Sequence, residues 1–249
     1  MWQLSNLDID DFLANYWQKK PLLIRQALVD FETVLSPEEL AGLACEEGVH
    51  SRLLIEKDAQ TPWQLSYGPF AEEAFTSLPM THYSLLVSEC EKWIPELQEL
   101  TELFNFIPKW RIDDLMISYA PDQGSVGPHI DEYDVFLIQA SGKRRWSIRN
   151  DVLENPEIIE GLDLAILQQF DPDQEWLLEP GDMLYLPPKI AHHGVAVGDG
   201  CMTYSVGFRA PAISDIMDSF LLEANEHKLT DQRYYDLPLD RNRNPAEIK

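Results

Sequence analysis

The chain has 249 residues and is 45% hydrophobic, which is enough for one well-buried domain with accessory helices or for two small domains. Its 43 acidic side chains outnumber the 19 basic ones and give a formal net charge of −24. Because such a surface repels the phosphates of nucleic acids, we expect no direct nucleic-acid binding. The charge suits a basic protein partner, although it could also serve solubility alone.

The cysteines and the N-terminus indicate a reduced, cytoplasmic setting. Cys45, Cys90 and Cys201 are widely spaced and form no CxxC pattern, so neither disulfide nor zinc staples are expected. The first residues lack the basic-then-apolar order of a signal peptide. No apolar run approaches the roughly 20 residues that cross a bilayer, so we expect no membrane association.

Residues 1–110 are predicted to be a mostly helical part that packs on the domain after it. Asp8 or Asp10 can cap a first helix, and Ser36 with Glu39 forms a capping box for a second. Further helices are predicted over 85–93 and 97–106, and short strands over 22–24, 51–57 and 63–67.

Residues 111–210 are predicted to form an antiparallel sandwich or barrel. Short β-rich runs alternate here with Gly, Pro and Asp. The predicted strands are 114–119, 133–139, 145–148, 176–178, 183–186 and 202–208.

Residues 211–249 are predicted to be a helical segment followed by a polar tail. Apolar residues recur at helical spacing from Ile213 to Leu221 and make one stripe. After Asp231 the sequence is polar and has no closing element, so we expect the chain to be truncated relative to a longer protein.

The spacing of His129 and Asp131 predicts part of a metal site. Side chains two apart on an extended strand share a face, so this pair can point together into a barrel. The turn Pro180-Gly181-Asp182 begins a second segment, which continues through a strand and two prolines to His192. If His192 lies opposite the pair, two histidines and one carboxylate form the facial triad of non-haem Fe(II) oxygenases.

Each of these elements also has an ordinary interpretation. A lone HxD is common by chance, and a Pro-Gly-Asp turn before a strand is frequent in β-proteins. His193 competes with His192, but strand neighbours face opposite ways, so only one of them can enter the site. The other histidines, His50, His82 and His227, lie in no comparable motif and are predicted to be surface or helix residues.

Three consecutive cations, Lys143, Arg144 and Arg145, lie inside the β-rich region. They could form a solvated turn, or one could point inward and bind an anionic co-substrate through its fork of donors. Alternation places Lys143 with Arg145 on one face and Arg144 with Trp146 on the other. Periodicity alone does not select the inward pair.

Several longer segments resemble the JmjC-domain ribosomal oxygenases, and among these the bacterial arginine hydroxylases of ribosomal protein L16. The resemblance covers essentially the whole chain. It rests on the stretches 11–28, 36–44, 110–146, 178–196 and 202–211.

The resemblance implies a mainly β fold, a double-stranded β-helix (cupin/JmjC) barrel with a helical N-terminal part. It also implies Fe(II), 2-oxoglutarate and hydroxylation of a protein side chain, most specifically an arginine of L16. By position, His129, Asp131 and His192 match the metal ligands and catalytic centre of the family. Arg144 and Ser118 match its 2-oxoglutarate contacts.

In the family the barrel is followed by a helical dimerisation region and a winged-helix-like domain. Residues 213–226 match the beginning of the former, which allows a homodimer, and the latter has no counterpart in this sequence. Thr203 stands where the resemblance leads us to expect Asn, so packing around the co-substrate could differ there.

Two other functions fit the same residues. The chain could be a cupin metalloenzyme that does not use 2-oxoglutarate, or a catalytically silent acidic protein that docks a basic partner. Demethylation is a further reaction open to the same chemistry. Acidic residues predicted near the mouth of the barrel could hold a cationic substrate; they are Asp113, Asp114, Asp122, Glu132 and Asp134.

Overall fold

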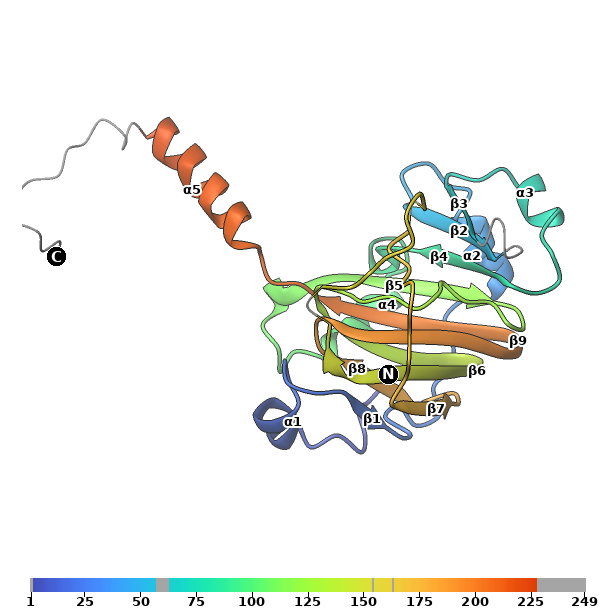
Figure 1. The fold of residues 1–249 in the computed structure, drawn as a ribbon, viewed down its shortest axis with the longest axis horizontal. Helices are drawn as coiled ribbons and strands as arrows, with labels where there is room; N and C mark the ends of the chain where they lie inside the picture. Colours follow the sequence, from blue (N-terminus) through green and yellow to red (C-terminus); the bar gives the residue numbers. More distant parts are fainter. Residues whose placement is uncertain (1, 57–62, 154, 163, 228–249) are drawn as a thin grey trace, which may run out of the picture. The chain divides into compact units, whose positions relative to one another are not determined.

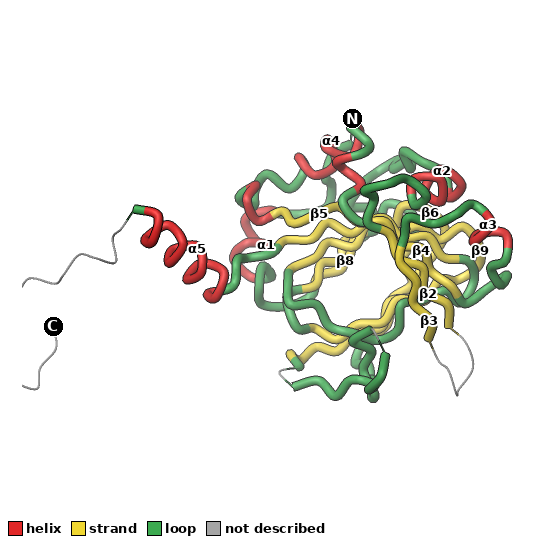
Figure 2. The backbone as a smooth tube through the Cα atoms, turned by 90° about the horizontal axis from the view of Figure 1, so that it is seen from above, coloured by secondary structure: helices red, strands yellow, loops and turns green. Residues whose placement is uncertain are grey.

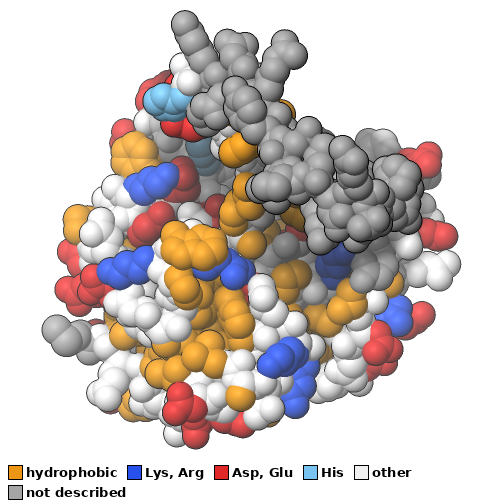
Figure 3. Space-filling model, turned by 90° about the vertical axis from the view of Figure 1, so that its left-hand side faces the viewer, with side chains coloured by type: hydrophobic (Ala, Val, Ile, Leu, Met, Phe, Trp, Pro, Cys, Tyr) orange, Lys and Arg blue, Asp and Glu red, His pale blue; other side chains and the backbone are white. Residues whose placement is uncertain are grey.

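The computed structural model describes residues 2–56, 63–153, 155–162 and 164–227. Contacts within the chain divide it into two units, residues 1–209 and 210–249, which are described separately below. Among the described residues, no helix is both long and apolar enough to cross a membrane. The face drawn in Figure 3 carries acidic side chains toward its edges, with hydrophobic side chains gathered nearer the middle.

The first unit is built mainly of antiparallel strands, with short helices concentrated before residue 112 (Figure 1). Its helical elements are α1 (Ile9–Asn15), α2 (Pro37–Leu43), α3 (Glu73–Thr76), η1 (Cys90–Lys92), α4 (Glu96–Glu102) and η2 (Lys109–Arg111). Its strands are β1 (Leu22–Ile24), β2 (Ser51–Glu56), β3 (Trp63–Tyr67), β4 (Tyr83–Val87), β5 (Ile112–Ala120), β6 (Asp134–Val152), β7 (Gln174–Leu178), β8 (Met183–Leu186) and β9 (Ile190–Phe208).

The strands form one nine-stranded sheet in the order β1-β8-β6-β9-β5-β4-β2-β3, with β7 also paired to β6. Figure 2 shows the strands curving round a common centre, with α1, α2 and α4 on the outside. The longest pairing joins β6 to β9, with register shifts after Gln139, Ser141 and Ile148. Such irregularities bend long strands, which lets one pair contribute to a strongly curved sheet.

The first part of strand β6, residues 134–140, is buried on both faces. Phe136 and Ile138 belong to the large core beneath the N-terminal helices, whereas Val135 and Leu137 point to the other side. This is the alternation that a strand between two packed layers must show.

The N-terminal helices cover the outer face of the sheet. Phe12 of α1 is fully buried, with its ring centroid 4.8 Å from that of Tyr185. Asp8 caps α1 by accepting from the Asp11 N–H, and the predicted capping box of Ser36 and Glu39 begins α2. The mainly β fold with a helical N-terminal part is therefore confirmed.

Two details of the predicted elements are wrong. The helix expected over 85–93 is instead the end of β4 followed by the single turn η1, because Leu85, Leu86 and Val87 form a short apolar run that suits a fully buried strand. The strands expected at 133–139 and 145–148 are one continuous strand, β6. A division of the first unit at residue 110 stays a prediction.

In the second unit, the predicted helix is present as α5 (Ile213–Glu226). Its apolar stripe is exposed in this single chain, with Ile213 80% and Phe220 61% accessible. The expected homodimer stays a prediction. The polar tail that was predicted after Asp231 lies outside the described residues.

Candidate metal centre

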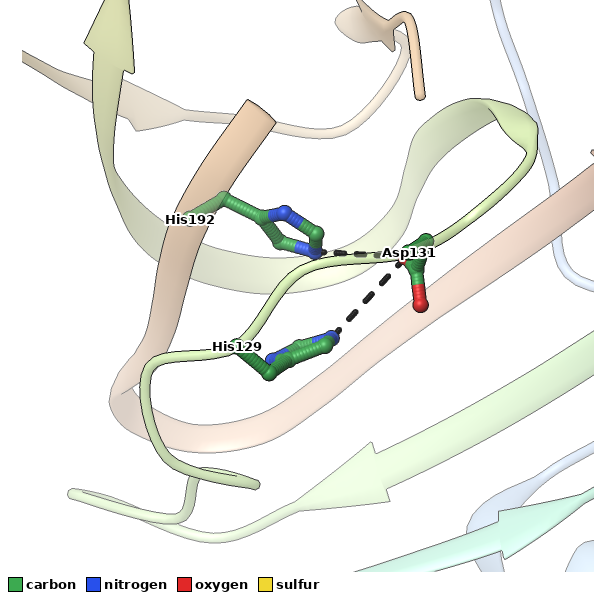
Figure 4. A group of neighbouring side chains, drawn as sticks. All are labelled: His129, Asp131 and His192. Carbon is green, nitrogen blue, oxygen red and sulfur yellow. Dashed lines mark ion pairs between the residues drawn. The ribbon is translucent and has the colours of Figure 1, made fainter. Parts of the chain in front are cut away.

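The structure brings together the three residues predicted as metal ligands. His129 and His192 pair as an antiparallel bridge, each amide N–H donating to the other residue's carbonyl oxygen at 3.0 and 2.9 Å. Asp131 Oδ2 lies 3.9 Å from Nε2 of His129 and 3.5 Å from Nε2 of His192 (Figure 4). One possible ligand atom from each side chain therefore lies within 4.8 Å of the other two.

Backbone carbonyls hold both imidazole rings in one orientation. Nδ1 of His129 lies 3.0 Å from the carbonyl oxygen of Gly127, and Nδ1 of His192 lies 2.9 Å from that of Ile190. A carbonyl only accepts, so each Nδ1 carries the proton and each Nε2 keeps its lone pair. Both lone pairs are thus available to a cation beside the Asp131 carboxylate, the arrangement typical of histidine metal ligands.

Burial chiefly, and the neighbouring His129 in second place, lower the pKa of His192 to about 4. Asp131 acts in the opposite direction without reversing the shift. His192 is consequently neutral near pH 7, and its approach to Asp131 places two potential ligands side by side rather than forming an ion pair. A neutral imidazole is the form that binds metal.

A short chain of hydrogen bonds supports the loop that carries His129. Ser125 is buried, and its Oγ accepts from the Gly127 N–H at 3.0 Å and lies 2.9 Å from Nε2 of His193. His193 thus contacts Ser125 and does not join the triad, as strand alternation predicted for one of the two neighbouring histidines. Since the Gly127 carbonyl orients His129, Ser125 and His193 fix the loop behind one candidate ligand.

The triad opens into a cavity of about 260 Å³. Apolar side chains form much of its wall, including Val126, Ile130, Leu164 and Ile166. Ile166 packs against Gly127, whose φ of +77° and close neighbours leave no easy place for a Cβ. Ile166, which lies between β6 and β7 in sequence, therefore packs directly against the loop that carries His129.

Arg144 and Trp146 are the inward pair of the cationic segment. Arg144 is only 3% exposed and lines the cavity, whereas Lys143 and Arg145 point outward and pair with Glu179 and Glu175. Nη1 of Arg144 donates a long hydrogen bond of 3.4 Å to the Gly194 carbonyl. Its Nε and Nη2 are buried and have no hydrogen-bond partner in the described part of the chain.

Ser118 and Thr203 face the same cavity from neighbouring strands. Both are buried, and they are directly paired in the register of β5 and β9. The Ser118 hydroxyl donates to the Thr203 carbonyl at 3.4 Å, and the Thr203 hydroxyl donates to Gln139 Oε1 at 3.4 Å. Such long hydrogen bonds leave the Ser118 hydroxyl able to turn toward a ligand.

The remaining histidines lie outside the cavity, as predicted. His50 lies 3.4 Å from Glu89, His82 contacts Thr81, and His227 lies 2.7 Å from Glu223.

A second, polar cavity of about 220 Å³ adjoins the first. Asp113 and Asp114 line it together with Tyr133, Ser205 and Arg209. Asp113 pairs with Arg209 at 3.1 Å, whereas Asp114 accepts only a long hydrogen bond of 3.4 Å from the Glu89 N–H among the described contacts. Burial raises the pKa of Asp114 to about 6, and the nearby carboxylates act in the same direction.

The prediction that Asp134 lines the mouth is wrong. Asp134 is fully buried, where its carboxylate accepts from Tyr185, from Gln18 and from Arg111, at 2.6, 3.0 and 3.2 Å. It is the first residue of β6, and alternation turns its side chain to the core beneath the N-terminal helices. Asp122 and Glu132 line neither of the two cavities.

Arg52 is the main cavity residue that the sequence reasoning missed. It lies on β2 and lines both cavities, together with Met116, Tyr133 and Ser205. The signal in the sequence is weak, because Arg52 is one charged residue that directly precedes the short apolar run 53–55, far from His129 in the chain.

Comparison with known proteins bears on the fold. A family model described as the JmjC domain matches residues 99–216, so this part of the chain is similar to JmjC domains. The matched segment begins in α4, ends in α5 and includes the triad, Ser118 and Arg144. The predicted cupin/JmjC fold is therefore confirmed.

Similarity to ribosomal oxygenases extends beyond the JmjC domain. The chain is 40% identical over 247 residues to the Escherichia coli protein "Ribosomal protein uL16 3-hydroxylase", covering 99% of this chain and 64% of the relative. It is 42% identical over 211 residues to a "Probable ribosomal oxygenase" of Haemophilus influenzae, covering 83% of this chain and 51% of the relative. The chain therefore spans less than two thirds of the length of these relatives.

The solved structure of the Escherichia coli ribosomal oxygenase YcfD, in complex with cobalt and 2-oxoglutarate, is similar in fold as well. It matches with a TM-score of 0.84 and 38% identity, covering 100% of this chain and 64% of that one. A structure of YcfD with cobalt and succinic acid matches with a TM-score of 0.83. The resemblance to JmjC-domain ribosomal oxygenases is therefore confirmed.

Proposed function

We propose that this chain is an oxygenase that uses Fe(II) and 2-oxoglutarate to hydroxylate an arginine of a ribosomal protein, L16 (uL16). The observation that carries the proposal is the presence, in one cavity, of three convergent ligand atoms and a buried arginine with unpartnered donors. The relatives support it, because one is named for hydroxylation of uL16 and a similar structure holds cobalt and 2-oxoglutarate.

The residues present fit a ferrous ion. Two neutral imidazoles and one carboxylate on one side of an ion form the donor set of non-haem Fe(II) oxygenases and leave coordination positions open. In this chain we assign these roles to His129, Asp131 and His192. The carbonyls of Gly127 and Ile190 hold the two rings, so the ligand set is oriented before the metal arrives.

The cavity also fits 2-oxoglutarate. A dicarboxylate bound at the metal by one end requires a cation for the other end, and we assign this role to Arg144. Its unpartnered Nε and Nη2 offer two donors that a carboxylate can accept together. Ser118, on the facing strand, is assigned a further hydrogen bond to the same co-substrate.

Bound iron and 2-oxoglutarate supply the oxidising power, coupling decarboxylation to succinate with the insertion of one atom of dioxygen into a C–H bond. The chain's own part is geometric. Arg144 and Ser118 fix the co-substrate, the triad fixes the metal, and the wall formed by Val126, Leu164 and Ile166 limits water around the reacting groups.

The adjoining polar cavity suits a cationic substrate side chain. Asp114 is a half-buried carboxylate with no cationic partner within 4.0 Å among the described residues, and Tyr133 and Met116 supply an apolar surface beside it. A guanidinium would give Asp114 the charge-assisted hydrogen bonds that it lacks. The strongly negative chain would also attract a basic ribosomal protein over longer distances.

The test is 2-oxoglutarate turnover by the purified protein, with L16 or an arginine-containing L16 peptide. We expect succinate formation to require Fe(II) and to rise with the substrate, which should gain the mass of one oxygen atom on an arginine. Absence of succinate with every substrate would leave the alternative of a cupin metalloenzyme that does not use 2-oxoglutarate. If the chain captures L16 but holds no metal and shows no turnover, the alternative of a catalytically silent docking protein is favoured.

Demethylation and location need separate observations. Release of formaldehyde from a methylated peptide would indicate demethylation rather than stable hydroxylation. A ribosomal substrate also implies that the chain works in the cytoplasm, and fractionation of cells that express it would test this.

A further inference from the structure

Two opposite charges line the polar cavity without pairing with each other. Arg52 contributes from β2 and Asp114 from β5. The recorded hydrogen bond of the Arg52 guanidinium goes to the Met116 sulfur at 3.7 Å, and a thioether is a weak acceptor. Within the described residues, no carboxylate lies within 4.0 Å of Arg52 and no cation lies within 4.0 Å of Asp114.

Strand pairing determines that Arg52 points toward the cavity. On β2, Ser51 and Leu53 face the core, so alternation turns Arg52 to the other side. Arg52 pairs with Leu86, Leu86 pairs with Ser118, and Ser118 pairs with Thr203. Arg52 thus lies in the same cross-strand row as three residues that line the metal cavity, and its own side chain lines both cavities.

We propose that Arg52 binds the main chain of the substrate, donating hydrogen bonds to a peptide carbonyl oxygen next to the residue that is modified. This inference rests on the proposed function and assigns a residue to substrate binding. One cationic amino-acid residue of a peptide has two features that match the pocket: a positive side chain for Asp114 and neutral carbonyl acceptors for Arg52. Holding both ends fixes which carbon of the side chain faces the triad.

A carbonyl fits better than a carboxylate at this position. Asp113 and Asp114 line the same small cavity; Arg209 pairs with Asp113, but Asp114 has no cationic partner within 4.0 Å among the described residues, so an anionic group bound at Arg52 would face this unpaired carboxylate. A carbonyl oxygen accepts from a guanidinium without bringing a second negative charge. Free arginine could present the same two groups, a guanidinium to Asp114 and its own carboxylate to Arg52. The experiment separates binding of a peptide carbonyl from binding of that carboxylate.

The experiment compares wild type with Arg52→Gln, Arg52→Lys and the matched control Arg145→Gln. Arg145 follows Arg144 in the sequence but points outward and pairs with Glu175. Its replacement therefore removes one positive charge outside both cavities. The probe is a short fluorescent peptide with one arginine, acetylated and amidated so that it has no terminal carboxylate. Binding is measured by anisotropy on the metal-free protein, and KM and kcat on the iron-loaded protein.

We expect Arg52→Gln to weaken peptide binding and raise KM by roughly tenfold to a hundredfold, the range for hydrogen bonds that involve a charged group. Arg52→Lys should recover part of the loss, since it keeps a charged donor without the fork. Arg145→Gln should stay within about threefold of wild type. Thermal unfolding of each variant identifies any that fail to fold. If Arg52→Gln fails to fold, Arg52→Lys is compared with wild type instead.

Equal peptide binding by wild type and a folded Arg52→Gln would overturn the assignment. It would also be overturned if Arg52→Gln weakened only free arginine or a peptide with a C-terminal carboxylate, since the ligand group would then be an anion. These outcomes differ from failure of the proposed function, in which wild type forms no succinate with any substrate. The anisotropy measurement tests Arg52 even in that case.

Discussion

Replacing Arg144 by methionine should weaken the binding of 2-oxoglutarate and at the same time stabilise the ligand-free protein. In the ligand-free chain, two guanidinium nitrogens are buried without a partner, and each such donor costs about 1–3 kcal/mol. Methionine has a similar length and no charge, so it removes this cost; it loses the cation–π contact with Trp146 but can still pack its apolar side chain against the ring. The same substitution removes the donors that we assign to 2-oxoglutarate.

The magnitudes follow from the contacts. Two charge-assisted hydrogen bonds at about 1.5 kcal/mol each amount to about 3 kcal/mol, or roughly a hundredfold weaker 2-oxoglutarate binding. Relief of the unpartnered donors should stabilise the ligand-free protein by about 1 kcal/mol, after loss of the long bond to the Gly194 carbonyl is set against it. For a chain of this size, that raises the unfolding midpoint by about 2–4 °C.

Two measurements check this prediction. Calorimetric titration of 2-oxoglutarate without oxygen, with Mn(II) in place of iron, gives the affinity, and scanning calorimetry of the metal-free protein gives the midpoint. Arg145→Met serves as the exposed control and should change neither quantity substantially. A variant of Arg144 that binds 2-oxoglutarate as tightly as wild type, or that unfolds at a clearly lower temperature, would refute the reasoning.

Three further predictions concern the substrate pocket, the ligand loop and the core. Since burial raises the pKa of Asp114 to about 6 and only its carboxylate form attracts a cation, kcat/KM for an arginine peptide should fall as the pH drops through about 6. Asp114→Asn should lower kcat/KM and remove that titration; a retained inflection would assign it to another group. Ser125→Ala should weaken Co(II) binding about 10–100-fold by loosening the loop before His129, while the equally buried Ser51→Ala should not, as followed by the cobalt spectrum. Phe12→Ala should cost about 3–5 kcal/mol of unfolding free energy in urea, and a loss below about 1 kcal/mol would contradict its place in the core.

The candidate triad was predictable because its signal is local and its pairing is simple. His129 and Asp131 are two residues apart, and His192 follows a recognisable turn and strand. The structure adds that His129 lies on an isolated bridge rather than within a regular strand. The orientation of the rings by Gly127 and Ile190 was not predictable, because it depends on backbone carbonyls that carry no sequence signature.

The errors have a common physical cause. The run Leu85 to Val87 is apolar on every position, so its periodicity cannot distinguish a buried strand from a buried helix. Asp134 lies close to Asp131 in sequence, but β6 begins at Asp134 and turns its side chain toward Arg111. In both cases the partner that decides the structure comes from a distant part of the chain.

The sequence by itself determined the alternation of residues along each strand, the caps of the first helices and the residue types of a metal site. Those properties depend on neighbours within a few positions, which the order of residues specifies directly. Only the tertiary structure decided that Arg144 rather than Arg145 faces the metal cavity, and that Arg52 and Asp114 line the same polar cavity. Which face of a strand becomes the inside depends on how the sheet curves and what covers it, and that is a property of all the strands together.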